Sequence, residues 1–251
     1  MYVFVIAWLA VIAVVYYLGQ ANQTFLLLAS NMISPASALL PAFYSLTLLR
    51  QYASDLKQRF AKAWVCLTVG LFLWLLGEIT WSFYTLVLSV SIPYPSVADV
   101  IWIAGYFPLA VALLLYLVPF REALSLKKAL TAVAVGLLAD VGVLVILVGP
   151  VLGLGADAST QFFDLAYPFL DTVLLGLAIG GTLVFLPGRI SRFWLWLNLG
   201  FILIAIADLL FSYSTALGLY YDGNPLELFY FLGDSAILLG LYDHKRILQG
   251  E

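Results

Sequence analysis

Two acidic side chains stand within long apolar segments, and each is followed at the same distance by a proline. Glu78 precedes Pro95 by seventeen residues, and Asp208 precedes Pro225 by seventeen. A carboxylate at the centre of a membrane helix costs about 2.5–3.5 kcal/mol. Such a cost is sustained only where the acid serves packing or function, so a functional interpretation starts from these two positions.

Beyond the first two residues of each apolar segment, the segments hold seven acids and no lysine, arginine or histidine to neutralise them. A buried carboxyl without a basic partner can hold a proton, accept hydrogen bonds from hydroxyl or indole groups, or hold a cation. Either the acids are hydrogen-bonded contacts between helices, or several line a binding site. We expect Asp140 and Asp234 near mid-span. The acids expected in the outer halves are Glu78, Asp99, Asp164, Asp171 and Asp208.

The candidate site combines the outer acids with hydroxyl and aromatic side chains close to them in sequence. Asp164 and Asp171 are seven residues apart, so they share one helix face with Tyr167 between them. That face and the turns after Glu78 and Asp208 predict an acidic cleft open to the outside. The predicted ligand-binding residues are Glu78, Trp81, Tyr94, Ser96, Asp99, Asp164, Tyr167, Asp171, Asp208 and Ser212.

The composition indicates a single integral membrane domain, residues 1–251. Of its residues 64 % are hydrophobic and 10 % charged, against roughly 25 % charged residues in soluble domains. We therefore expect the lipid bilayer as its surroundings. A net charge of −3 offers no basic face for nucleic acid. The single Cys66 permits neither an intrachain disulfide nor a cysteine metal site.

The hydropathy predicts an all-α membrane protein with eight transmembrane helices, because each apolar run approaches the ~20 residues that cross the hydrocarbon. The first run lacks the basic start and cleavage site of a signal peptide, so we expect a retained helix. Pro35, Pro41 and Pro168 predict kinks within the second and sixth spans. The predicted spans are 2–18, 24–49, 62–88, 96–118, 129–151, 162–186, 193–217 and 226–242.

The basic residues predict the orientation of these spans. All eleven lysines and arginines fall within 50–62, 121–128 and 189–192, which are alternate connections, or at 245–246, after the last span. The positive-inside rule places such segments in the cytoplasm. Both termini are therefore predicted to be cytoplasmic, and the protein is predicted to lie in the cell membrane.

The two halves of the chain resemble each other, which predicts internal repeats over 1–120 and 128–243. Besides the matching acids and prolines, Gly105 and Gly233 follow at similar distances, and Pro41 and Pro168 hold matching places in the second and sixth spans. A unit of four helices preserves the orientation of the chain, so the repeat is predicted to be a parallel 4+4 arrangement.

Several chemistries lack the residues that they require. A retinal Schiff base needs a lysine inside a helix, and every lysine lies in a basic segment. Haem b and catalytic zinc sites in helix bundles use histidines, whereas the one histidine, His244, stands among charged residues and is expected on a solvated surface. No nucleophile, metal set or phosphate-binding loop is recognisable. We therefore expect no bound cofactor and no enzyme, although the carboxyl groups leave acid–base chemistry on a lipid open as a third interpretation.

A glycine-acid helix is followed by a proline-serine-x-x-aspartate turn and a glycine-tyrosine pair, and segments 166–171 and 206–212 carry related acidic motifs. The first set is Gly77, Glu78, Pro95, Ser96, Asp99, Gly105 and Tyr106. This pattern resembles the multi-helix membrane input domains that precede diguanylate cyclase or histidine kinase output domains in prokaryotic signalling proteins. Only five residues follow Arg246, so either the chain stops at a domain boundary, or a separate cytoplasmic partner receives the signal, or the fold has another use.

The residues and the resemblance together predict a polytopic sensor or receptor-like module that binds a small ligand or cation in an acidic, outward-facing cleft. The ligand would bias helix packing that is read at the cytoplasmic side. The alternative is a proton- or cation-coupled transporter or channel, which the carboxyl groups would also serve. Acids along a continuous route would favour transport, and acids that stop at a closed floor would count against it.

Overall fold

Seven helices in the computed structural model are long and apolar enough to cross a membrane. The structure describes residues 1–52, 55–90, 94–123, 125–127, 130–131, 134–135, 138, 141, 157–186 and 188–250. The helices are α1 (Tyr2–Gly19), α2 (Gln23–Tyr52), α3 (Arg59–Phe83), α4 (Val97–Leu117), α6 (Ala158–Phe185), α7 (Ser191–Ala216) and α8 (Leu228–Leu248). The short turns are the π-helical η2 (Tyr84–Leu88) and the 3-10 helices η3 (Val118–Ala123) and η4 (Pro225–Glu227).

The all-helical membrane prediction is confirmed for these spans, with bounds within a few residues of those expected. The last span, for example, is predicted over 226–242 and runs over 225–248 when η4 is included. The described residues hold seven candidate spans and not the predicted eight. The remaining predicted span, 129–151, lies outside the described residues except for isolated positions, as do Asp140 and Pro93.

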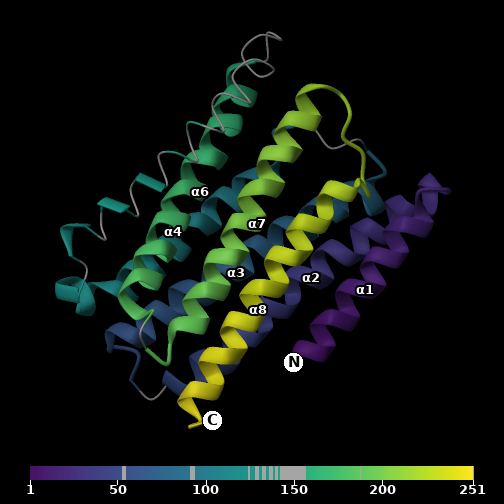
Figure 1. Cartoon of the computed structure of the whole chain (residues 1–251). Helices are drawn as coiled ribbons and strands as arrows, with labels where there is room; N and C mark the ends of the chain where they lie inside the picture. The colour runs from purple at the N-terminus through teal and green to yellow at the C-terminus, as the bar shows by residue number, and fades with distance from the viewer. Residues whose placement is uncertain are drawn as a thin grey trace.

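Six helices form a closed ring, and α1 lies beside it. In the order α2, α3, α4, α6, α7 and α8, each helix packs against the next, and α8 packs against α2. α1 contacts α2 and α8, and Figure 1 shows it at the edge of the bundle. The space enclosed by the ring is therefore bordered by helices from both halves of the chain.

Two neighbouring pairs in the ring, α4 with α6 and α2 with α8, run parallel. Just before α4, Tyr94 donates a hydrogen bond to Asp164 near the start of α6 at 2.6 Å. Near the ends of the same helices, the ring centroids of Tyr116 and Phe185 are 6.0 Å apart. The chain between α4 and α6 therefore leads from one end of the ring back to the other.

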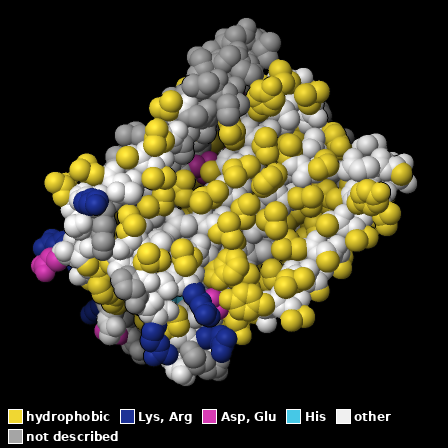
Figure 2. Space-filling view, in the orientation of Figure 1, with side chains coloured by type: hydrophobic (Ala, Val, Ile, Leu, Met, Phe, Trp, Pro, Cys, Tyr) yellow, Lys and Arg dark blue, Asp and Glu magenta, His cyan; other side chains and the backbone are white. Residues whose placement is uncertain are grey.

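The basic side chains gather at the end of the bundle that also holds both termini. The hydroxyl of Tyr2 donates to Asp243 near the end of α8 at 2.7 Å, which fixes the start of α1 there. Figure 2 shows lysine and arginine at this end and a mostly apolar surface along the helices. We name it the basic end. Its described residues at helix ends and turns include Arg50, Lys57, Arg59, Lys62, Arg121, Arg189, Arg192, Lys245 and Arg246.

His244 is buried near the basic end, so the expectation of a solvated surface position is wrong. Its side chain is 2 % exposed, with ring centroids 4.9 Å from Trp64 and 4.8 Å from Phe193. The charged neighbours in sequence are misleading because α8 continues through this position. One of its faces packs into the ring while the next residues turn outward.

Glycines bring α3 close to α4 and α7 close to α8, and the two contacts are built alike. A Cβ on Gly70 would lie 3.0 Å from the carbonyl oxygen of Gly105 across α3 and α4. A Cβ on Gly200 would lie 3.1 Å from the carbonyl oxygen of Gly233 across α7 and α8. Small residues allow such close backbone approach between membrane helices, and here they place the acids of both pairs around one space.

Candidate functional site

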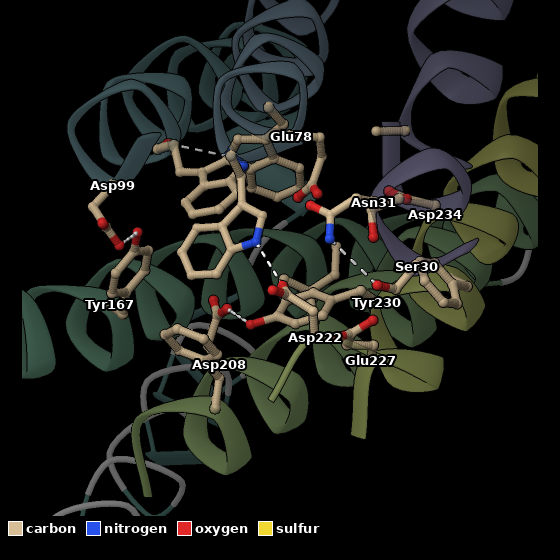
Figure 3. A pocket seen from close by; sticks show the side chains of 18 of the residues that line it. Ser30, Asn31, Glu78, Asp99, Tyr167, Asp208, Asp222, Glu227, Tyr230 and Asp234 are labelled. Atoms are coloured by element: carbon tan, nitrogen blue, oxygen red, sulfur yellow. Dashed lines mark hydrogen bonds between the residues drawn. The ribbon is translucent and has the colours of Figure 1, made fainter. Parts of the chain in front are cut away.

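A cavity of about 100 Å³ lies within the ring, toward the end opposite the basic end. Its position follows from Asp222 and Glu227, which line it from the connection between α7 and α8. Figure 3 shows the lining side chains arranged around this space. The lining residues are Ser30, Asn31, Ser34, Ala38, Trp74, Glu78, Trp81, Asp99, Trp102, Tyr106, Tyr167, Ile204, Asp208, Phe211, Ser212, Tyr220, Asp222, Glu227, Tyr230, Phe231 and Asp234.

Six carboxyl groups line the cavity, and the described lining includes no lysine, arginine or histidine. Clustered carboxylates repel one another, so each needs a proton, a hydrogen-bond donor or a cation to remain in so enclosed a place. The donors available to each acid therefore indicate its role. The six are Glu78, Asp99, Asp208, Asp222, Glu227 and Asp234.

Asp99 is held by the start of its own helix and by α6. Ser96 is the N-cap of α4, and its backbone N–H and hydroxyl both donate to Asp99 Oδ2, at 2.6 and 2.8 Å. This reciprocal capping box satisfies backbone groups that the first helical turn leaves free. The hydroxyl of Tyr167 donates to the other oxygen, Oδ1, at 3.0 Å. Asp99 is thus fully engaged in structure.

Asp208 receives hydrogen bonds from two tyrosines. The hydroxyl of Tyr230 donates to its Oδ1 at 2.6 Å, and the hydroxyl of Tyr106 lies 2.9 Å from its Oδ2 and 2.7 Å from Asp171 Oδ1. A hydroxyl carries one proton and can donate to only one of two carboxyls. Its short contact with the other carboxyl therefore requires a proton on Asp171 or Asp208. Together these two acids hold less negative charge than two carboxylates would.

Glu227 is held at the start of α8 by three donors. The hydroxyls of Tyr16 and Tyr220 donate to its two oxygens at 2.5 and 2.9 Å, and the backbone N–H of Gly223 donates at 2.7 Å. Gly223 has a φ of 86°, and a Cβ there would lie 2.3 Å from Leu26. Only glycine fits this turn, so the turn, α1 and Glu227 are fixed together.

Asp222 lies in the connection between α7 and α8, where its carboxylate accepts a hydrogen bond from Trp81 Nε1 at 3.0 Å. Burial raises the pKa of Asp222, and hydrogen bonds from Trp81 and Asn31 act against that rise. Burial and the neighbouring Glu227 carboxylate raise the pKa of Tyr220. This side of the cavity therefore keeps tyrosine neutral and is unfavourable for additional negative charge.

Glu78 and Asp234 have fewer such donors than the other four lining acids. Among the described residues, the indole of Trp102 is the donor beside Glu78, whose charged neighbours include Asp234. The same part of the structure offers Asp234 no hydrogen-bond donor at all. Figure 3 shows both side chains at the cavity together with Asn31. These two acids are therefore the lining carboxyls with the fewest hydrogen-bond donors from the protein.

Aromatic rings form the wall beside Glu78. Trp102 can lie against α3 because residue 77 is glycine, where a Cβ would meet its Nε1 at 2.3 Å. Its ring centroid is 5.8 Å from that of Trp81, which in turn lies 5.9 Å from Phe211. The π faces of such rings attract cations, so the wall and the acids favour the same charge of ligand.

The cavity ends at an apolar floor halfway along the helices. Ala38, Trp74 and Ile204 are the lining residues nearest the basic end on α2, α3 and α7. Beyond this layer the core continues with Leu71, Leu109, Phe201 and Ile237. The lining acids therefore stop above a closed layer in the described part of the chain.

Six of the ten predicted ligand-binding residues line the cavity, and four do not. Tyr94 and Asp164 pair with each other at 2.6 Å, Ser96 caps α4, and Asp171 contacts Tyr106 behind the lining. The predicted common face of α6 is confirmed, because Asp164, Tyr167 and Asp171 all bond to residues in or just before α4. The six lining residues are Glu78, Trp81, Asp99, Tyr167, Asp208 and Ser212.

The predicted site lacked several residues that the ring brings together. Asp234 stood out as a mid-span acid but was not included in the site. Asp222 lies in a polar connection, where an acid carries no signal of burial, and Glu227 stands at the very start of the last predicted span. Asn31 belongs to α2, which is distant in sequence from every predicted site residue; a polar amide within an apolar helix was its only signal.

No family model, curated protein or solved structure matches this chain. Among the described residues, no three His, Cys, Asp or Glu side chains are grouped so that they could hold a metal ion. The case for function therefore depends on the cavity itself.

Proposed function

We propose that this protein is a polytopic membrane sensor or receptor-like module that binds a small ligand or cation in its acidic cavity. The observation that carries the proposal is a cavity lined by six carboxyl groups and, in the described part of the chain, by no basic residue. A ligand signals by binding one of two helix arrangements more tightly. Helices from both halves border this cavity and continue to the basic end, where a cytoplasmic partner would read the change.

The proposed topology has eight spans with both termini in the cytoplasm. It is supported by α4 and α6, which run parallel, so the chain between them must return across the ring. It is also supported by the basic end, which carries both termini and the charge expected on a cytoplasmic face. An impermeant maleimide should label N22C only from outside intact cells and K57C only after permeabilisation, in a C66S background. The reverse pattern would contradict the topology.

The proposed parallel repeat is supported by equivalent contacts in the two halves. Gly70 with Gly105 corresponds to Gly200 with Gly233, and each pair joins the third and fourth spans of its unit. A side-chain N-cap also precedes the last span of each half: Ser96 caps α4, and Asn224 caps the turn η4 that leads into α8. The ring has the same symmetry, because α2 packs between α3 and α8 as α6 packs between α7 and α4.

The transporter or channel alternative requires a polar route through the protein. Its supporting observation is the number of carboxyl groups, which could pass protons or cations. The apolar floor at Ala38, Trp74 and Ile204 favours the sensor instead. Proteoliposome flux of H⁺, Na⁺ or K⁺ that depends on Glu78 would reverse this preference.

Binding can be tested by the thermal unfolding midpoint of the purified protein in detergent with a panel of probes. The panel comprises Na⁺, K⁺, Mg²⁺, Ca²⁺, small amines, amino acids, carboxylates and sugars. We expect at least one probe to raise the midpoint of the wild type and not that of E78Q/D234N. D164N is the matched control, because Asp164 pairs with Tyr94 away from the lining. A panel without any such probe would refute the proposal.

Transmission to the basic end can be tested with spin labels at K57C and K245C in a C66S background. The stabilising probe from the panel should change the distance distribution between the labels. An unchanged distribution would show that binding does not reach the basic end, which contradicts the sensor function.

A further inference from the structure

Glu78 and Asp234 correspond in position to Asp208 and Tyr106, where the tyrosine supplies a hydroxyl to the acid. Tyr106 directly follows Gly105, and its hydroxyl lies 2.9 Å from Asp208. Asp234 directly follows the equivalent Gly233 and is among the charged neighbours of Glu78. At matching places, one half therefore supplies a hydroxyl donor and the other supplies a second acid. Besides protons on the acids themselves, a ligand that brings positive charge and hydrogen-bond donors would satisfy this pair.

The amide oxygen of Asn31 adds a third acceptor to this part of the cavity. Its side chain is 3 % exposed and lines the cavity. Its Nδ2 donates to the carbonyl oxygen of Leu27 at 3.0 Å, while its Oδ1 has no partner among the described residues. A buried acceptor without a donor costs about 1–3 kcal/mol. Figure 3 shows this amide beside the cavity with Glu78 and Asp234.

The chemistry of three acceptors distinguishes among positively charged ligands. A multivalent metal is disfavoured because the described residues offer no group of three metal-binding side chains. One added proton provides a single donor for three acceptors. A primary ammonium group carries one positive charge and three N–H donors, which matches two carboxyls and one amide oxygen. The indoles of Trp81 and Trp102 favour the same charge.

Resting on the proposed binding function, we infer that the cavity binds a small primary ammonium ion, with its nitrogen between Glu78, Asp234 and Asn31. The apolar part of the ion lies against Trp81 and Trp102. The volume of about 100 Å³ limits the ligand to a few non-hydrogen atoms, because an engineered cavity of about 150 Å³ holds benzene. An alkylamine of four or so carbons fits this limit.

The experiment compares three probes of equal non-hydrogen size on the wild-type protein: n-butylammonium, 1-butanol and tetramethylammonium. Butanol has the shape without the charge, and tetramethylammonium has the charge without N–H donors. Binding is measured by tryptophan fluorescence, because Trp81 and Trp102 line the site, and by the thermal unfolding midpoint. We expect butylammonium to bind at least tenfold more tightly than either of the other probes.

The variants locate the site. E78Q and D234N should each weaken butylammonium binding about tenfold or more, and N31L should weaken it severalfold. D164N, an acid outside the lining, should bind as the wild type does. Should a variant fail to fold, the comparison of the three probes on the wild type still decides the ligand class.

Two results would overturn the inference. If butanol or tetramethylammonium binds as well as butylammonium, or if Na⁺ or K⁺ binds with the same dependence on Glu78, the ligand class is wrong while the proposed binding function stands. If neither these probes nor any member of the wider panel binds, the inference and the proposed function fail together.

Discussion

Glu78 and Asp208 hold matching positions in the two halves of the ring but have opposite surroundings. Each lies eight residues beyond a glycine that contacts the next helix of the ring, Gly70 on α3 or Gly200 on α7. Asp208 accepts hydrogen bonds from Tyr230 and Tyr106. Glu78 has the indole of Trp102 and the carboxyl of Asp234.

The difference arises at two matching positions on α4 and α8. Trp102 and Tyr230 each lie three residues before the contacting glycine, and Tyr106 and Asp234 each lie one residue after it. Two glycine contacts of similar geometry are therefore followed by side chains of different chemistry. Asp208 is hydrogen-bonded between helices, whereas Glu78 and Asp234 face the cavity. A binding site tolerates polar groups without partners that a purely structural core does not.

The largest effect is expected from placing an acid in the satisfied half. Y106D would set a third carboxyl beside Asp171 and Asp208 and remove their shared donor. An uncompensated buried charge costs about 3–5 kcal/mol, so the unfolding free energy in detergent should fall by that order. Y106F, which removes only the hydroxyl, should cost about 1–3 kcal/mol. Equal losses for both variants would contradict the role given to charge.

Next in size is the glycine that admits Trp102 beside Glu78. In G77A the new Cβ would lie 2.3 Å from Trp102 Nε1, and the rigid indole would have to move. Overpacking of this kind costs about 1–3 kcal/mol. G176A is the matched control, because a Cβ on Gly176 meets no atom within 4 Å. The thermal unfolding midpoint should be lower for G77A than for G176A. A G77A midpoint equal to that of the wild type would show that the wall is loosely packed.

A smaller gain in stability is expected when the unsatisfied half is given a tyrosine. D234Y would remove the carboxyl that repels Glu78 and offer it a hydroxyl donor, as Tyr106 does for Asp208. One such hydrogen bond contributes about 1 kcal/mol, and butylammonium binding should disappear. Retained binding in a folded D234Y protein would contradict the assignment of Asp234, whereas D234N should lose binding without this gain.

The smallest effect is expected at Asp222, through pH. Burial raises its pKa above the ordinary value of 3.8, so the folded state binds this proton more tightly than the unfolded state does. The associated stability is complete below pH 3.8 and is lost as pH rises through the folded pKa. D222N lacks this loss, so its stability relative to the wild type should increase with pH from 3.8 upward, by at most about 1.4 kcal/mol per pH unit. A difference independent of pH would contradict a raised pKa.

The sequence by itself determined the membrane class, seven of the helices and the gathering of basic residues at alternate helix ends. Apolar runs and charge patterns are local, and in a bilayer they must be helical because every backbone polar group has to be bonded within the span. The common face of Asp164, Tyr167 and Asp171 followed from helical periodicity for the same reason.

Only the tertiary structure decided which acids are satisfied and which are available. The donors to Asp208 come from α4 and α8, and the unpaired oxygen of Asn31 comes from α2, so these neighbourhoods exist only once the ring closes. The burial of His244 likewise depends on the face that α8 turns inward. The sequence indicates which carboxyl groups are buried at a cost in free energy. The hydrogen bonds that offset this cost join helices far apart in the chain.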